Sequence, residues 1–235
     1  MKKTLLLIIL AAICTAIYAQ EEQKTDSAAP KPKKFINTEY RAIIEEDSPE
    51  ILYGKAFLTI YDEGQTQDYA MMKSNAKDLT FSANLVIPSS EKDSKNAFTA
   101  DANFKVDGSS LLVTLDDVSM TSKKMVLKLK KRIQDDVLGD NEKKNAQLRE
   151  AEASINAYMQ SLFSKIKNSK ANVTDKYWKE IANGNIVKGM SMDECLLSKG
   201  KPGTMFKESD YSTQWSYGLY YTIYFSDGIA EEVVK

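Results

Sequence analysis

The chain has 235 residues, of which 43% are apolar and 28% are charged, and its formal net charge is −1. This length predicts one or two domains, and an apolar fraction near the globular average excludes disorder over most of the chain. A net charge near zero argues against a general binder of polyanions, so we expect no nucleic-acid partner. The sequence contains no histidine, which excludes Ser-His-Asp and Cys-His catalysis, histidine-ligated metals and the commonest general base at neutral pH.

Residues 1–19 have the pattern of a secretory signal peptide. Lys2 and Lys3 precede the apolar run Leu5–Ile13, and small residues lead to a cleavage site after Ala19. The run is about half the roughly 20 residues that a membrane-spanning helix needs, which favours a cleaved signal over an anchor. Cys14 raises the alternative of a lipoprotein, but a large isoleucine stands where such sites prefer a small residue. We therefore expect export to the periplasm or beyond the cell, with outer-membrane association left open and no spanning segment in the mature chain.

The mature chain begins with a leader that has few apolar residues. Residues 20–34 are polar and charged and contain two of the five prolines, which is typical of a disordered tether. Cys195 would be the only cysteine after cleavage, so no intramolecular disulfide can form. Its neighbours Leu196 and Leu197 favour a buried structural thiol over a nucleophile.

Residues 35–122 predict an α+β domain. Tyr40, Ala42 and Ile44 alternate as in a strand, and Ser48-Pro49-Glu50 is typical of the start of a helix whose apolar residues recur four apart. Strand-like alternation follows at Leu79–Ile87, at Ala97–Val106 and from Leu111 onward, and an Asp107-Gly108 turn separates the last two.

Residues 123–172 predict a helical connector. Its first ten residues include six basic ones and could form a strand edge or the start of a helix, and a solvated face is favoured over a contact with anionic lipid. Between Asn141 and Asn168, Leu148, Ile155 and Leu162 are spaced seven apart on a single apolar stripe. This stripe is more typical of a helix packed on its own domain than of a site for a partner helix.

Residues 173–235 predict two helices followed by three strands, ααβββ. Thr174 can start a helix that ends at Gly184, and Ser191 with Glu194 forms a capping box for a second helix that Gly200 and Pro202 end. The expected strands are Gln214–Tyr217, Leu219–Phe225 and Ile229–Val234. The whole fold class is therefore α+β.

This C-terminal segment resembles the SmpA/OmlA family of outer-membrane assembly lipoproteins. The matching elements are Ile186–Ser191, Glu194, Gly200–Pro202, Gln214–Tyr217 and Tyr224–Gly228. The resemblance implies a cell-envelope protein that binds or positions other proteins without catalysis.

The N-terminal domain resembles an uncharacterised domain of bacterial secreted proteins with a TATA-binding-protein-like fold. The resemblance rests on Val106-Asp107-Gly108 before the last strand and on Asp116-Asp117 after it. It implies an architecture and no activity.

Carboxylates are the remaining catalytic candidates. They occur as the neighbours Glu45–Asp47, Asp116-Asp117 and Asp135-Asp136, and adjacent residues on a strand point to opposite faces, so they do not readily converge on one substrate. We therefore expect no catalytic residue, no metal site and no cofactor. A carboxylate-based extracellular hydrolase or an enzyme inhibitor is the alternative.

Aromatic residues near the C-terminus are the candidate partner-binding residues. On the strand Leu219–Phe225, alternation places Tyr220 and Tyr224 on the face away from the helices, and Trp215 and Tyr217 share a face of the preceding strand. Exposed aromatics are good contacts for a protein or glycan, whereas cross-strand packing is the alternative. The sequence predicts a non-enzymatic exported envelope protein that uses Trp215, Tyr217, Tyr220 and Tyr224 to bind envelope proteins of unknown identity.

Overall fold

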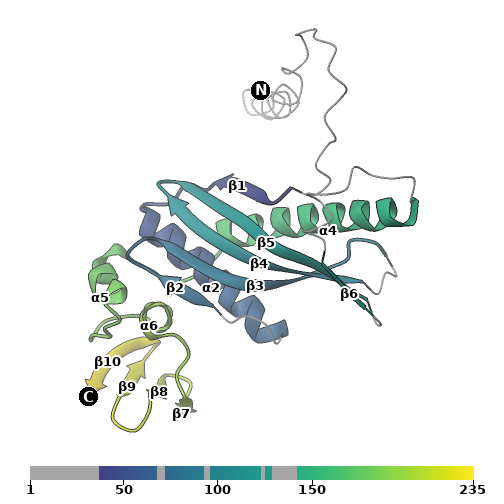
Figure 1. Ribbon diagram of the computed structural model, residues 1–235. Coiled ribbons are helices and arrows are strands. Elements are labelled where there is room, and N and C mark those ends of the chain that lie inside the picture. Colours follow the sequence, from purple (N-terminus) through teal and green to yellow (C-terminus); the bar gives the residue numbers. More distant parts are fainter. Residues whose placement is uncertain (1–36, 68–71, 93–95, 123–124, 129–141) are drawn as a thin grey trace, which may run out of the picture. The chain divides into compact units, whose positions relative to one another are not determined.

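The structure is a computed structural model that describes residues 37–67, 72–92, 96–122, 125–128 and 142–235. Residues Lys34–Lys235 form one compact unit. It contains helices and two antiparallel sheets (Figure 1), which confirms the predicted α+β fold class. The predicted signal peptide and leader, residues 1–34, lie outside the described residues.

The larger sheet has six antiparallel strands in the part of the chain that the structure describes. They are β1 (Glu39–Ile43), β2 (Lys73–Asn75), β3 (Thr80–Pro88), β4 (Ala97–Asp107), β5 (Ser110–Ser122) and β6 (Met125–Lys128). The order is β1-β5-β4-β3-β2, and β6 pairs with the end of β5. The predicted hairpin between β4 and β5 is confirmed, since Asp107 pairs with Ser110 and Gly108 has the positive φ that a tight turn requires. The strand β2 was not predicted.

Two helices cover one face of this sheet, α2 (Pro49–Gln67) and α4 (Glu142–Lys167) (Figure 1). The hydroxyl of Ser48 accepts a hydrogen bond from the N–H of Ile51 at 3.2 Å, which caps α2 as the sequence predicts. Alternate residues of β3, β4 and β5, such as Leu85, Phe98 and Val113, are buried against the helices. Most of the intervening residues are polar, and they lie on the opposite face of the sheet, which is open to solvent.

The predicted connector helix packs on its own domain. Its apolar stripe is buried at Ala151, Ile155, Met159, Leu162 and Ile166. The Tyr40 hydroxyl on β1 donates to Oδ1 of Asn156 at 2.9 Å. Of the basic segment before this helix, Met125–Lys128 forms the strand β6, and its other residues, 123–124 and 129–132, lie outside the described ranges.

The C-terminal segment contains η1 (Asp175–Tyr177), α5 (Trp178–Ala182), α6 (Met192–Lys199) and a sheet of order β10-β9-β8-β7. Its strands are β7 (Thr204–Lys207), β8 (Ser212–Ser216), β9 (Thr222–Ser226) and β10 (Ile229–Val234). The prediction of three strands missed β7.

The predicted strand Leu219–Phe225 was also too long. Gly218 has φ +75°, and the N–H of Tyr217 donates to the carbonyl of Tyr221 at 2.8 Å, so Leu219 and Tyr220 lie in a turn. Leu219 is therefore exposed, whereas Ile223 and Phe225 point into the core as predicted.

The predicted capping box of α6 is confirmed, and its Glu194 carboxylate also holds the residue that precedes η1. The Ser191 hydroxyl accepts from the N–H of Glu194 at 3.1 Å, and the Glu194 carboxylate accepts from the N–H of Ser191 at 2.9 Å. The other carboxylate oxygen accepts from the N–H and the hydroxyl of Thr174, at 3.0 and 2.7 Å. Gly200, with φ +73°, ends α6.

Candidate binding surfaces

Exposed apolar side chains are concentrated on the C-terminal sheet. In the described part of the chain, eight of the ten exposed large hydrophobic side chains lie between residues 205 and 234. They are Met205, Phe206, Tyr211, Leu219, Tyr220, Tyr224, Ile229 and Val234. Such a concentration, surrounded by polar residues, is typical of an interaction surface.

The outer face of this sheet carries a row of side chains that crosses all four strands. The strand register places Phe206, Gln214, Tyr224 and Glu232 opposite one another, and we call these four residues the outer row. Phe206 is 60% exposed and Tyr224 is 39% exposed. The neighbouring outward positions of β8 and β9 hold serine and threonine, so the two aromatic rings stand above short polar side chains.

The two edges of the C-terminal sheet differ. At the β10 edge, the N–H of Gly189 donates to the carbonyl of Ala230 at 2.7 Å, and the N–H of Ala230 donates to the carbonyl of Met190 at 2.8 Å. At the other edge, all four residues of β7 are exposed, and among the described residues β8 is the only strand that pairs with it. An edge strand of this kind offers unpaired N–H and C=O groups to another extended chain.

The structure separates the four predicted partner-binding residues. Tyr220 is 81% exposed in the turn between β8 and β9, and Tyr224 lies in the outer row. Trp215 is 5% exposed and its ring lies 4.8 Å from that of Phe225. Tyr217 is half-buried and its hydroxyl donates to the carbonyl of Gly200 at 2.9 Å.

Trp215 and Tyr217 do share a face, as predicted, but that face is the buried one. They therefore contribute to the packing of the C-terminal segment. Met205 and Phe206 were missed, because Thr204–Lys207 shows no alternation of apolar and polar residues. The sequence feature that could have indicated this strand is the pair of adjacent large apolar residues, Met205 and Phe206, shortly after Gly203.

Of the carboxylate clusters that were the remaining catalytic candidates, Asp135-Asp136 lies outside the described residues, and members of the other two take part in local structure. Glu46 pairs with Lys55 at 2.7 Å, and Asp116 accepts from the side-chain amide of Asn103 at 3.2 Å. Asp117 has φ +47° next to a register shift between β4 and β5. Within the described ranges, no group of three or more acidic or cysteine residues could hold a metal ion.

The single described thiol is a buried structural group, as the sequence predicts. Cys195 is fully buried in α6, and this burial, with a smaller effect of the neighbouring Glu194, raises its pKa to about 12. The thiol therefore stays protonated at neutral pH, and a protonated thiol is a poor nucleophile.

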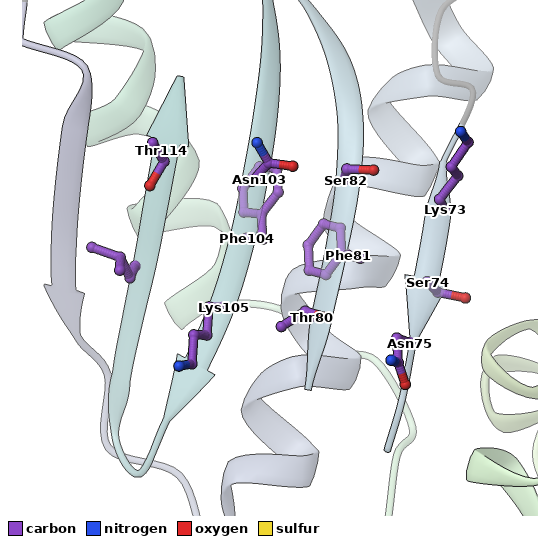
Figure 2. A pocket seen from close by; sticks show the side chains of 11 residues that line it. Lys73, Ser74, Asn75, Thr80, Phe81, Ser82, Asn103, Phe104, Lys105 and Thr114 are labelled. Carbon is purple, nitrogen blue, oxygen red and sulfur yellow. The ribbon is translucent and has the colours of Figure 1, made fainter. Parts of the chain in front are cut away.

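A pocket to which mainly polar residues contribute lies on the open face of the larger sheet (Figure 2). It has a volume of about 480 Å³. Its lining comes from β2 to β5 and consists of Lys73, Ser74, Asn75, Thr80, Phe81, Ser82, Asn103, Phe104, Lys105, Leu112 and Thr114. Figure 2 shows Lys73, Ser82, Asn103 and Thr114 in one line across four strands, as the strand register requires. No helix in the described ranges is long and apolar enough to cross a lipid bilayer.

Comparison with known proteins shows similarity of fold and nothing about activity. No protein-family model and no curated protein matches the sequence. The chain is similar to the crystal structure of a TBP-like protein from Parabacteroides distasonis, with 9% identity, a TM-score of 0.43, and coverage of 56% of this chain and 92% of that one. It is also similar to a DUF4468 family protein from Bacteroides ovatus, with 12% identity, a TM-score of 0.44, and coverage of 58% and 88%.

These two similarities bear on the predicted resemblances. One of the two matched structures is described as TBP-like, which is the architecture that the N-terminal resemblance implies, whereas the resemblance of residues 173–235 to SmpA/OmlA proteins receives no support from the comparisons. The similarity to the TBP-like protein and to the DUF4468 family protein extends over 56% and 58% of this chain.

Proposed function

We propose that this chain is a non-enzymatic, exported cell-envelope protein that binds a partner protein through its C-terminal sheet. The observation that carries the proposal is the concentration of exposed apolar side chains on this sheet, with Phe206 and Tyr224 in one row across it. Aromatic side chains bury a large area at little entropic cost and dominate the binding energy of many protein interfaces.

The partner contributes an extended segment that pairs with the open edge of β7. The N–H of Glu208 donates to the carbonyl of Ser212 at 3.0 Å. Because alternate residues of an edge strand direct their backbone groups to opposite sides, the N–H of Lys207 points away from β8. A partner strand that pairs there places every second side chain on the outer face beside Phe206, which gives both affinity and specificity.

The absence of catalysis is part of the proposal and is supported by the chemistry available. The sequence has no histidine, the Cys195 thiol is held protonated, and the described carboxylate clusters serve ion pairs, turns and a bulge. Export is supported by the signal-peptide pattern of residues 1–19.

Site-specific photo-crosslinking in the native envelope tests the proposed surface. A photoreactive amino acid is placed at Phe206 or Tyr224 and, as a matched control, at Ile43, which is 73% exposed on the larger sheet. We expect one protein adduct that is shared by positions 206 and 224 and missing at position 43. Adducts of equal yield at all three positions, or none at 206 and 224, would contradict the proposal.

A second pair of variants tests the edge pairing. Lys207→Pro removes the outward N–H of β7, whereas Lys207→Ala removes the same side chain and keeps the N–H. Loss of the adduct with proline alone is expected. Equal loss with both variants would show that the lysine side chain, and not the backbone, contacts the partner.

A further inference from the structure

The pocket on the open face of the larger sheet has hydrogen-bonding groups that the fold does not use. The ammonium groups of Lys73 and Lys105 form no ion pair or hydrogen bond with another described residue, and the same is true of the hydroxyl groups of Thr80, Ser82 and Thr114. The lining contains two lysines and no carboxylate. The pocket therefore favours a ligand that carries negative charge together with many hydroxyl groups.

The positions of the two lysines set the spacing of charge on that ligand. Lys73 lies on β2 and Lys105 on β4, two strands away, and they belong to neighbouring rows of the sheet. Two strand spacings amount to about 10 Å, and two residues along a strand to about 7 Å. Figure 2 shows both side chains at the margins of the pocket, with Ser82 and Thr80 between them.

The rest of the face disfavours a densely charged ligand. Asp101 lies opposite Asp116 in the next row of the sheet, and Asp116 contacts the pocket residue Asn103. A nucleic acid carries a phosphate at every nucleotide and would bring several of them close to these carboxylates. The exposed apolar side chains on this face, Leu112 and Ile43, are aliphatic and give no aromatic platform for bases.

We propose that this pocket binds an acidic saccharide, a chain of sugar rings that carries carboxylate groups at intervals. The ammonium groups of Lys73 and Lys105 form ion pairs with carboxylates of the saccharide. The hydroxyl groups of Thr80, Ser82 and Thr114 form hydrogen bonds with the hydroxyl groups of the sugar rings. Leu112 contacts an apolar face of a ring. The site is on the other sheet from the proposed protein-binding surface and does not depend on it.

Titration calorimetry with short oligogalacturonate tests the site on the mature chain, residues 20–235. The matched neutral probe is the same oligomer with its carboxylates methyl-esterified. We expect the acidic oligomer to bind at least about tenfold more tightly than the ester, with an affinity that falls as salt is added. Absence of binding by the acidic oligomer, or equal affinity for the two, would overturn the proposal.

Two double variants with the same change of net charge locate the binding. Lys73→Gln with Lys105→Gln should weaken binding at least about tenfold, whereas Lys179→Gln with Lys188→Gln, which changes exposed lysines elsewhere, should leave it unchanged. Equal effects of the two double variants would refute the site. Tighter, lysine-dependent binding of a single-stranded DNA oligonucleotide would refute the choice of a saccharide.

Discussion

Replacing Glu194 with glutamine tests the joint at which α6 and the preceding helical segment begin. Glu194 is 2% exposed, and its two oxygens accept hydrogen bonds from the N–H groups of Ser191 and Thr174 and from the Thr174 hydroxyl. Glutamine keeps one acceptor oxygen and places an NH₂ group where the other oxygen was. In either orientation of the amide, at least one backbone N–H then faces a donor.

The magnitude follows from the cost of a buried donor without an acceptor, about 1–3 kcal/mol. We expect Glu194→Gln to lower the free energy of unfolding by about 2 kcal/mol, and Glu194→Ala, which leaves both N–H groups without their acceptor, by about 3–5 kcal/mol. With a urea m-value of about 2 kcal/mol/M, the glutamine variant moves the unfolding midpoint by about 1 M.

Urea titration followed by tryptophan fluorescence provides the assay. The two tryptophans, Trp178 in α5 and Trp215 in β8, both lie in the C-terminal segment, within which Glu194 connects the starts of two helices. Glu180→Gln is the matched control, since Glu180 accepts from the Asn185 side chain in an exposed position, and a change within about 0.5 kcal/mol is expected. A Glu194→Gln midpoint equal to that of the control would refute the buried network.

Three further outcomes are expected. Gly200→Val should cost about 1–3 kcal/mol, because φ +73° with ψ −161° is open in practice to glycine alone, whereas Gly203→Ala should cost little; equal melting temperatures would contradict this. Cys195 should resist thiol reagents at pH 8 until the protein unfolds. Because burial raises the pKa of this thiol from about 9 in the unfolded chain to about 12 in the folded protein, the free energy of unfolding should fall as the pH rises from 9 to 12. The Cys195→Ala variant should show a shallower fall of that free energy over the same pH range. Trp215→Ala should cost about 3–5 kcal/mol, because its ring is buried against Phe225, whereas Tyr220→Ala should leave the melting temperature unchanged; the reverse order would show that the two faces are misassigned.

Local sequence signals predicted the elements that depend on local chemistry. Ser48-Pro49, the Ser191–Glu194 box and the Asp107-Gly108 turn each act within a few residues, and the structure contains all three. The apolar stripe of α4 was recognised because its spacing repeats over several turns of a long helix.

Elements that depend on distant partners were missed. The strands β2 and β7 are three and four residues long, and every residue in them is exposed, so they show no alternation of buried and exposed positions. Pairing with a longer neighbour defines them. The start of β9 was placed too early because Leu219 and Tyr220 extend the alternation of the strand into a turn set by Gly218.

The candidate surface was predicted only in part, for a related reason. Alternation shows which residues share a face, but it does not show which face is buried when both carry aromatic rings. Trp215 and Tyr217 were therefore grouped with Tyr220 and Tyr224, although the first two pack inward. Phe206 was missed together with the strand that carries it.

The affinity of the crosslinked partner for paired surface variants is the most direct test of the central claim that the C-terminal sheet binds a protein. Phe206→Ser with Tyr224→Ser removes both aromatics of the outer row, and Ile43→Ser with Leu112→Ser removes two exposed apolar side chains of the larger sheet. Truncating central aromatics costs on the order of 2 kcal/mol or more, so surface plasmon resonance should show the first double variant binding at least about tenfold more weakly. The second double variant should bind as the unaltered protein does. Unchanged affinity of the first variant, with both variants folded, would contradict the assignment of this sheet as the binding surface.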